Sequence, residues 1–289
     1  MTDPALSLDQ LAKRFDRTEV LQGISASVGP GEVIGLLGLN GAGKTTLLET
    51  ALGFSLPDGG SARIFGQASI EMDGATKARI GFVPQRDELL EGMKAESYLA
   101  LIAEFYPNWN RQLVDRLARE WAVPLATRIN KLSVGQRQKL SIISALGHEP
   151  DLIILDEPVA SLDPVARRQF LKELVDIASG QTRSIVFSTH IVSDLERVAS
   201  RVWLMQEGRL ALDAGMDDLK ENIVRLSLPK GAQLPPAVAG KSVLRKRSAA
   251  NGETTVLLRD WNHYAAADLP AGTQIDSLSL EDLFLELHA

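Results

Sequence analysis

The sequence contains no cysteine, so the chain can form neither disulfides nor thiolate metal sites. It also lacks any run that approaches the roughly 18 apolar residues of a membrane-spanning helix, since apolar stretches such as 33–39 and 152–155 are short. The start of the chain, MTDPALSLDQ, has neither the basic region nor the apolar region of a secretory signal peptide. These absences lead us to expect a cytoplasmic protein that does not span a membrane.

An excess of basic charge is also missing. The 289 residues carry a formal net charge of −6, whereas nucleic-acid binding normally needs a concentrated basic surface. The dense basic cluster Arg245-Lys246-Arg247 has no interleaved aromatic residues and is interpreted as a solvated strand face. Direct binding of nucleic acid is therefore not expected. The hydrophobic content of 45% is enough for a sizeable core.

Short apolar runs alternate with helical patterns through much of the chain. The run 32–37 passes through a glycine-rich turn into a helical pattern at 44–52, which predicts a strand, a loop and a helix. The runs 151–156 and 184–188 are apolar throughout, as is typical of strands in a parallel sheet that is buried on both faces. The fold class predicted for the core is therefore α/β.

Two segments depart from this alternation. Between residues 85 and 130, helix-forming stretches at 95–106 and 111–123 are separated by Pro107, and no strand signal has comparable strength. We interpret about 86–145 as a helical subdomain inserted into a core domain of residues 1–220. Residues 221–289 are predicted to form a small accessory α+β domain.

The accessory domain has its own strand and helix signals. Strand-like runs occur at 223–228, 242–247 and 253–258, the last two joined around Asn251-Gly252, a dipeptide suited to a tight hairpin turn. In the final segment SLEDLFLEL, Ser279 can cap a short helix with Asp282 as its reciprocal partner. This helix has one apolar stripe, which packs either on the domain itself or on a partner chain, formed by Leu280, Leu283, Phe284 and Leu287.

A phosphate-binding motif lies between the first predicted strand and helix. Residues 38–45 match G-x-x-x-x-G-K-[ST] in full, and glycines there let successive N–H groups and the helix N-terminus point at one phosphate. Lys44 supplies a positive charge to the β- and γ-phosphates, Thr45 a hydroxyl to Mg²⁺, and Thr46 a further phosphate contact. The predicted nucleotide-binding residues of this segment are Gly38, Leu39, Asn40, Gly41, Ala42, Gly43, Lys44, Thr45 and Thr46.

Two adjacent carboxylates end the apolar strand at 152–157. A buried strand of a parallel sheet delivers such acids to the carboxyl edge, where ligands bind. Adjacent strand residues point in opposite directions, so Asp156 is assigned to the Mg²⁺ ion and Glu157 to the attacking water. Without the phosphate loop, the same pair before Pro158 would be a turn signal.

Further motifs carry a family resemblance. The segment Leu132-Ser133-Val134-Gly135-Gln136 resembles the signature motif of ABC ATPases, and it lies shortly before the Asp-Glu strand, as in that family. Gln85 in FVPQ resembles the family's Q-loop, Asp163 in SLD its D-loop and His190 in STH its switch histidine. The motifs occur in the family's order over about residues 5–215. The chain therefore resembles the ATP-binding subunits of ABC transporters, with a P-loop NTPase core of the ABC type.

The resemblance implies a dimer that encloses Mg-ATP. Ser133, Gly135 and Gln136 of a second chain would contact the nucleotide held by the first phosphate loop, and Asp163 would cross the interface. His190, with Glu157 and Lys44, would be catalytic. Gln85, with Thr45 and Asp156, would hold Mg²⁺. Every catalytic motif is present, so a homodimer is expected, with a heterodimer as the alternative.

The sequence departs from the family pattern in three places. Val134 stands where the family often has Gly, and Ala160-Ser161 replaces a more usual Ser-Gly. Phe15 matches the aromatic position that stacks on adenine, although the family more often has Tyr, and a structural aromatic is the alternative. None of these changes removes a group expected to act on phosphate.

The transported cargo is the least defined part of the interpretation. The ending SLEDLFLEL, the accessory domain and residues 105–110 (FYPNWN) resemble ATP-binding subunits of ABC-2-type exporters. The resemblance implies a separate transmembrane permease as partner, at the cytoplasmic face of the membrane, and ATP with Mg²⁺ as cofactors. The alternatives are an importer ATPase, a soluble ABC-type ATPase that acts on nucleic acid or the ribosome, and a non-catalytic scaffold.

Overall fold

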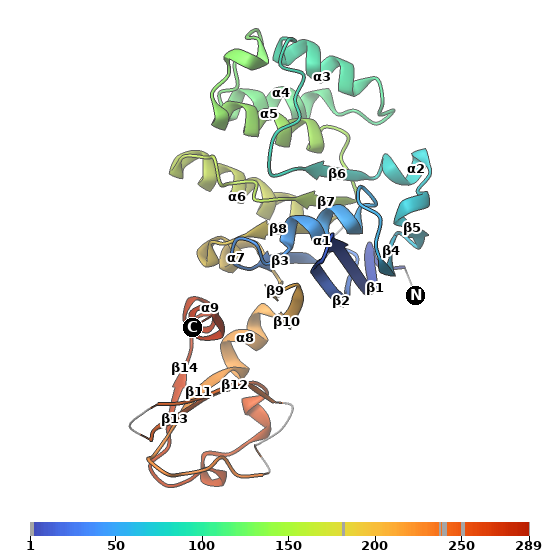
Figure 1. Cartoon of the computed structure of the whole chain (residues 1–289). Coiled ribbons are helices and arrows are strands. Elements are labelled where there is room, and N and C mark those ends of the chain that lie inside the picture. Colours follow the sequence, from blue (N-terminus) through green and yellow to red (C-terminus); the bar gives the residue numbers. More distant parts are fainter. Residues whose placement is uncertain (1–2, 181–182, 237, 239–241, 250–251, 289) are drawn as a thin grey trace. The chain divides into compact units, whose positions relative to one another are not determined.

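The computed structural model describes residues 3–180, 183–236, 238, 242–249 and 252–288 and divides into two compact units, 1–213 and 214–289 (Figure 1). The division falls a few residues before the boundary at 220 expected from the sequence, because helix α8 (Met216–Asn222) contacts the 3-10 turn η3 (Trp261–His263) of the second unit. Within the described residues, no helix combines the length and the apolar character needed to cross a bilayer.

A six-stranded sheet forms the centre of the first unit. β3, β7 and β8 lie where the sequence predicts strands, and every residue in them is buried. The pairs β9–β3, β3–β8, β8–β7 and β7–β6 are parallel, which confirms the predicted α/β class. In spatial order, the strands are β10 (Arg209–Gly215), β9 (Arg201–Gln206), β3 (Val33–Leu37), β8 (Ser184–Thr189), β7 (Leu152–Leu155) and β6 (Ile80–Val83).

A second, four-stranded sheet in this unit was not predicted. Leu6, Leu8 and Leu11 on its first strand are buried, but the register shifts between Leu8 and Leu11, and Gln10 has a φ of 46°. This irregularity breaks the strict alternation by which a sequence reveals a strand. In spatial order, the strands are β2 (Thr18–Val28), β1 (Leu6–Phe15), β4 (Gly59–Ile64) and β5 (Gln67–Ala68).

Helices lie between β6 and β7 in the chain, in the segment interpreted as a helical subdomain. Figure 1 shows α3 (Ala95–Ala103), α4 (Arg111–Glu120) and α5 (Val134–Leu146) as one group above β6. α4 ends before residue 123, the predicted limit, because Ala122 has a φ of 52°, outside the helical region. The remaining helical elements of the unit are α1 (Lys44–Ala51), η1 (Ser69–Glu71), α2 (Gly74–Lys77), η2 (Ile129–Lys131), α6 (Pro164–Ser179) and α7 (Val192–Val198).

The second unit is an antiparallel sheet with its own core. β11 (Val224–Leu228) pairs with β13 (Thr254–Leu258) and with β14 (Gln274–Ser277), and β13 pairs with β12 (Val243–Ser248). β14 was not predicted. The core of the second unit includes Leu226, Val256 and Leu258, all fully buried. η4 (Ala266–Asp268) follows η3 in the connection to β14.

The predicted hairpin turn and the predicted helix cap of this unit have different outcomes. β12 and β13 do pair, but Asn251, the first residue of the predicted tight turn, lies outside the described residues. Ser279 accepts a hydrogen bond from the Asp282 N–H over 3.0 Å and donates to its carboxylate over 2.6 Å, as predicted, where α9 (Leu280–His288) begins. The four residues of the predicted apolar stripe are buried, namely Leu280, Leu283, Phe284 and Leu287.

Candidate functional site

The loop at 38–43 joins buried β3 to α1 and has a conformation that requires glycine. Gly41 and Gly43 have φ angles of 82° and 101°, in the left-handed region that side chains disfavour. A Cβ on Gly38 would lie 2.8 Å from the backbone oxygen of Met205. The loop therefore folds back tightly before the first turn of α1, as the motif predicts.

Lys44, the first residue of α1, points back into this loop. Its Nζ lies 2.8 Å from the Gly38 oxygen and 3.3 Å from the Leu39 oxygen. It also pairs with Glu157 Oε1 at 3.3 Å, and both side chains are almost completely buried. Burying two charges is tolerated because they neutralise each other.

A chain of hydrogen bonds links α1 with the ends of β7 and β8. Thr45 donates its hydroxyl to Asp156 Oδ2 over 2.6 Å, and Ser188 donates to Asp156 Oδ1 over 2.5 Å. The Glu157 N–H donates to Ser188 Oγ over 2.7 Å. His190 Nδ1 lies 3.0 Å from Glu157 Oε2. The structure thus brings together residues that the sequence assigns to Mg²⁺ binding and catalysis.

Glu157 has an unusual backbone. Its φ is 47°, which is uncommon for a residue with a side chain and costs free energy of order 1–3 kcal/mol. The change of direction directly after β7 lets Asp156 face Thr45 while Glu157 faces Lys44 and His190. Such conformations persist where neighbouring contacts determine them, and here the Ser188 hydrogen bond is one such contact.

A cavity of about 310 Å³ lies beside the phosphate loop, and we call it the nucleotide cavity after the ligand that the sequence predicts. Most of the described residues that line it were predicted to bind nucleotide or metal, and Glu157 was predicted to be catalytic. Val20 also lines it and was not predicted, since an apolar residue on an unrecognised strand gave no signal. The lining residues are Val20, Asn40, Gly41, Gly43, Lys44, Thr45, Thr46, Gln85 and Glu157.

Other predicted residues lie outside this lining. Gly38, Leu39 and Ala42 belong to the loop without lining the cavity, and Ala42 is buried beneath it. Phe15, at the end of β1, is 50% exposed and carries the Lys13 Nζ 5.2 Å from its ring centre. About half of the surface of Phe15 is therefore accessible to solvent.

The predicted signature segment caps α5. Ser133 accepts a hydrogen bond from the Gln136 N–H over 3.2 Å, and Gln136 Oε1 accepts one from the Ser133 N–H over 2.9 Å. This reciprocal pair is a capping box, which leaves α5 with a well-defined N-terminus. Val134 is 54% exposed there, and a Cβ on Gly135 would lie 3.2 Å from the Ser161 oxygen. Ser133, Gly135 and Gln136 are not among the described residues that line the cavity.

Asp163 caps the next helix. Its carboxylate accepts hydrogen bonds of 2.9 Å from the Val165 and Ala166 N–H groups at the start of α6. The Ala166 N–H in particular lowers the pKa of Asp163, because it favours the charged form. Within this chain the residue therefore fixes the beginning of α6.

The oxygen groups around Thr45 fit the ligand preference of Mg²⁺. Magnesium binds hydroxyl, carboxylate and amide oxygens and keeps several waters. The Thr45 hydroxyl and an Asp156 oxygen are 2.6 Å apart, and the Gln85 side chain lines the same cavity.

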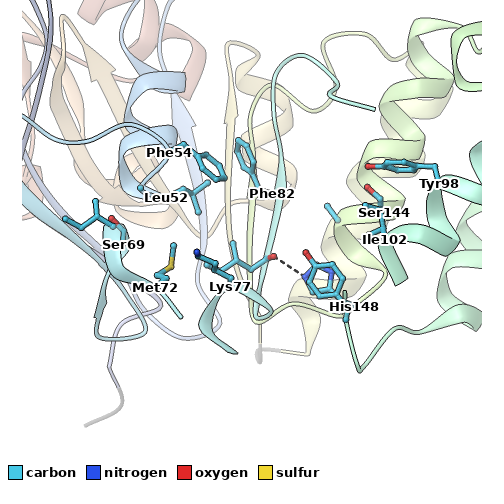
Figure 2. A pocket seen from close by; sticks show the side chains of 15 residues that line it. Leu52, Phe54, Ser69, Met72, Lys77, Phe82, Tyr98, Ile102, Ser144 and His148 are labelled. Carbon is cyan, nitrogen blue, oxygen red and sulfur yellow. Dashed lines mark hydrogen bonds between the residues drawn. The ribbon is translucent and has the colours of Figure 1, made fainter. Parts of the chain in front are cut away.

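A second cavity, of about 440 Å³, lies in the first unit between the sheet and the helical group. Figure 2 shows Phe54 and Phe82 on one side, with ring centres 5.3 Å apart, and Tyr98 and Ile102 on the other. His148 stacks on Tyr106 at 3.9 Å, and its Nε2 lies 3.0 Å from the Ile80 oxygen (Figure 2). Burial lowers the pKa of His148. We call this cavity, which aromatic, aliphatic and some polar residues line, the aromatic groove.

Known proteins match both the sequence and the fold. The ABC transporter family model matches residues 21–160. The chain is 31% identical over 307 residues to Nod factor export ATP-binding protein I of Burkholderia pseudomallei, covering 99% of this chain and 98% of that protein. It is 28% identical over 223 residues to ABC transporter ATP-binding protein YtrB of Bacillus subtilis, covering 77% and 76%.

Solved structures agree. A structure of an ATP-binding subunit of an ABC transporter superposes with a TM-score of 0.68 at 28% identity, covering 75% of this chain and 92% of the other. A dimeric ATP-binding cassette bound to ADP and Pi gives 0.67 at 20% identity, which supports the fold alone. These matches confirm the predicted P-loop core of the ABC type. The chain belongs to the family of ABC transporter ATP-binding proteins and is an ATPase subunit, as its motifs predict.

Proposed function

We propose that this chain binds Mg-ATP beside the phosphate loop and hydrolyses it with Glu157 as the acceptor of a proton from the attacking water. One observation carries the proposal: Glu157, directly after β7, lines the cavity beside the phosphate loop, and its neighbour Asp156 is hydrogen-bonded to Thr45, which lines the same cavity. Ser188 on β8 fixes both acids through hydrogen bonds. His190, 3.0 Å from Glu157, would orient the water and the γ-phosphate. The water oxygen bonds to the γ-phosphorus while the bond from that phosphorus to the bridging oxygen of the β-phosphate breaks, so ADP leaves with the bridging oxygen.

The phosphate loop supplies most of the binding. Its N–H groups and the N-terminus of α1 favour an anion, and the Lys44 ammonium adds a full positive charge. Thr45, Asp156 and Gln85 would hold Mg²⁺, which would supply positive charge to offset the negative charge of the phosphates. Phe15 would stack on the adenine, since this aromatic residue at the end of β1 is half exposed.

A second copy would complete the site. The N-terminus of α5 is solvent-exposed at Val134 and does not line its own cavity, yet it has the N–H groups that bind phosphate in other proteins. We therefore propose that Ser133, Gly135 and Gln136 contact the γ-phosphate held by the partner copy. Asp163 would lie at that interface. ATP then joins the copies, and hydrolysis releases them.

Glu157→Gln tests this mechanism. The amide cannot accept the proton from water, so the variant should bind Mg-ATP, hydrolyse it very slowly and remain a dimer, as measured by size-exclusion chromatography with light scattering. Lys44→Ala in the same background should stay monomeric, because it loses the charge that binds phosphate. A Glu157→Gln protein that remains monomeric at saturating Mg-ATP would contradict the proposed mechanism.

We further propose that the dimer drives a separate transmembrane subunit at the cytoplasmic face of the membrane, in the direction of export. A relative named for Nod factor export aligns along nearly the whole chain, including the second unit, which favours export over an importer ATPase. The aromatic groove fits a short amphipathic helix of that subunit. Among its described lining residues, Lys77 is the only charged one, so an acidic residue on the partner helix would complement it.

Identification of the protein that copurifies tests this part of the proposal. A polytopic membrane protein recovered from detergent-solubilised membranes would support transport. Ribosomes or DNA would favour the alternative of a soluble ABC-type ATPase.

A further inference from the structure

An ion pair joins the loop that carries Gln85 to the helix that carries the signature segment. Arg137, on α5, donates from Nε to Asp87 Oδ2 over 3.1 Å. Both side chains are largely shielded, with 24% and 17% of their surfaces exposed. The same guanidinium reaches the backbone oxygen of Leu132 at 3.5 Å. Arg137 therefore contacts both the loop and the first residue of the signature segment.

The same loop also contacts the chain just before the signature segment. The Ile129 N–H donates to the Met93 oxygen over 2.9 Å, and the Asn130 N–H donates to the Glu91 oxygen over 3.1 Å. The loop 85–93 thus holds the signature segment from both sides, through 129–130 before it and Arg137 after it. These contacts provide a physical link between the loop at Gln85 and the N-terminus of α5.

We propose that the Asp87–Arg137 ion pair is a positioning contact that sets the orientation in which the α5 N-terminus meets the nucleotide of a second copy. This rests on the proposed ATP-joined dimer. Neither side chain is among the described residues that line the nucleotide cavity, so the pair acts through the segments that it joins. Loss of the pair should weaken dimerisation while leaving each copy's own ATP site intact.

The physical argument is one of preorganisation. Without the pair, α5 keeps its capping box and its core contacts, but its first turn is no longer fixed to the loop that lies at the nucleotide. Formation of the dimer must then offset the conformational entropy that is lost when that turn becomes ordered. A partly buried ion pair holds such an orientation better than an exposed one, because solvent screens it less.

Neutral substitutions in a Glu157→Gln background provide the test. Asp87→Asn, Arg137→Gln and the double variant should each raise the ATP concentration for half-maximal dimerisation by about three- to tenfold, with the double variant no worse than the single ones. Binding of a fluorescent ATP analogue to the dilute monomer should change less than about twofold in all of them. The exchanged pair, Asp87→Arg with Arg137→Asp, should recover part of the loss.

Glu96→Gln is the matched control. It breaks the exposed ion pair with Lys94, 3.3 Å long, in the same helical group and should leave dimerisation unchanged. If the Asp87 and Arg137 variants dimerise as well as their parent, the inference alone is overturned. It is also overturned if the double variant loses dimerisation by the sum of the two single losses and its melting temperature falls by the sum of the two single decreases. A parent that stays monomeric with Mg-ATP would overturn the proposed function and this inference together.

Discussion

Ser188 donates its hydroxyl to Asp156 Oδ1 over 2.5 Å, and in the same position it accepts the Glu157 N–H over 2.7 Å. One buried hydroxyl on β8 therefore fixes both adjacent acids at the end of β7. The hydrogen bond from the Glu157 N–H stabilises a backbone conformation with positive φ, which residues other than glycine rarely adopt. Ser188 positions the acids without lining the nucleotide cavity.

Ser188→Ala should lower the kcat of ATP hydrolysis by about tenfold, because a lost buried hydrogen bond is worth about 1–3 kcal/mol and here bears on the catalytic geometry. The KM for ATP should change little, since the phosphate loop is untouched. Steady-state ATPase kinetics measure both. Ser184→Ala is the control, because Ser184 is a buried serine on the same strand that donates to the Gly29 oxygen, far from the acids. Equal kcat values for both variants would count against a positioning role.

Phe54→Ala should reduce recovery of the transmembrane partner by more than about fivefold, since large aromatic side chains contribute most to such contacts. Phe54 is 67% exposed at the rim of the aromatic groove, so the change should cost little stability. Affinity purification from detergent-solubilised membranes measures the recovery. Phe105→Ala removes a ring that is 70% exposed but outside the groove lining, and it should have no such effect. Equal recovery with both variants would argue against the groove as the docking site.

Glu49→Gln should make stability less dependent on pH. Burial, followed by the charges of Asp156 and Glu88, raises the pKa of Glu49 above its ordinary value of 4.5. The folded state then binds the proton more tightly than the unfolded state, so the stability that Glu49 contributes is present below pH 4.5 and is lost as the pH rises through the raised pKa. In thermal melts from pH 4 upward, the melting temperature of the variant should rise relative to that of the parent. Parallel curves would refute this assignment.

Arg116→Met should destabilise the first unit by about 1–3 kcal/mol, because it leaves the carboxylate of Glu173 buried without its cation. Arg116 on α4 holds Glu173 on α6 through two hydrogen bonds of 2.7 and 3.1 Å, and only 9% of the Glu173 side chain is exposed. Urea denaturation measures the loss. Glu120→Gln removes the other, exposed partner of Arg116 and should cost less than about 0.5 kcal/mol.

The elements proposed to bind phosphate could be predicted because local sequence determines them. The loop at 38–43 needs glycine for its backbone, Lys44 begins a helix directly after it, and the apolar run of β7 ends in acids. These features depend on residues that are neighbours in the chain. The α/β class followed from such local runs, and the family from the resemblance of the motifs at Gln85, 132–136, Asp163 and His190. The comparisons confirm both.

The rest depends on contacts between distant segments. β1 escaped prediction because Gln10 interrupts its alternation, and β14 because its pairing with β11 lies far along the chain. Ser188 could have been noted as a polar residue ending a buried strand, but only the parallel register of β7 and β8 brings it to the acids. No sequence pattern indicated that Arg137 would pair with Asp87.

The capping box at the start of α5 restricts which residue position 133 can hold. Ser133 Oγ accepts a hydrogen bond from the Gln136 N–H. The same hydroxyl also carries a proton, which this hydrogen bond does not use. Asparagine and aspartate start helices equally well, yet aspartate would repel an incoming anion and neither has a hydroxyl to offer it. Ser133 Oγ can therefore cap the helix and donate a hydrogen bond to an anion at the same time. We expect the substitutions tolerated at position 133 to be those that preserve anion binding, and not all those that preserve the helix.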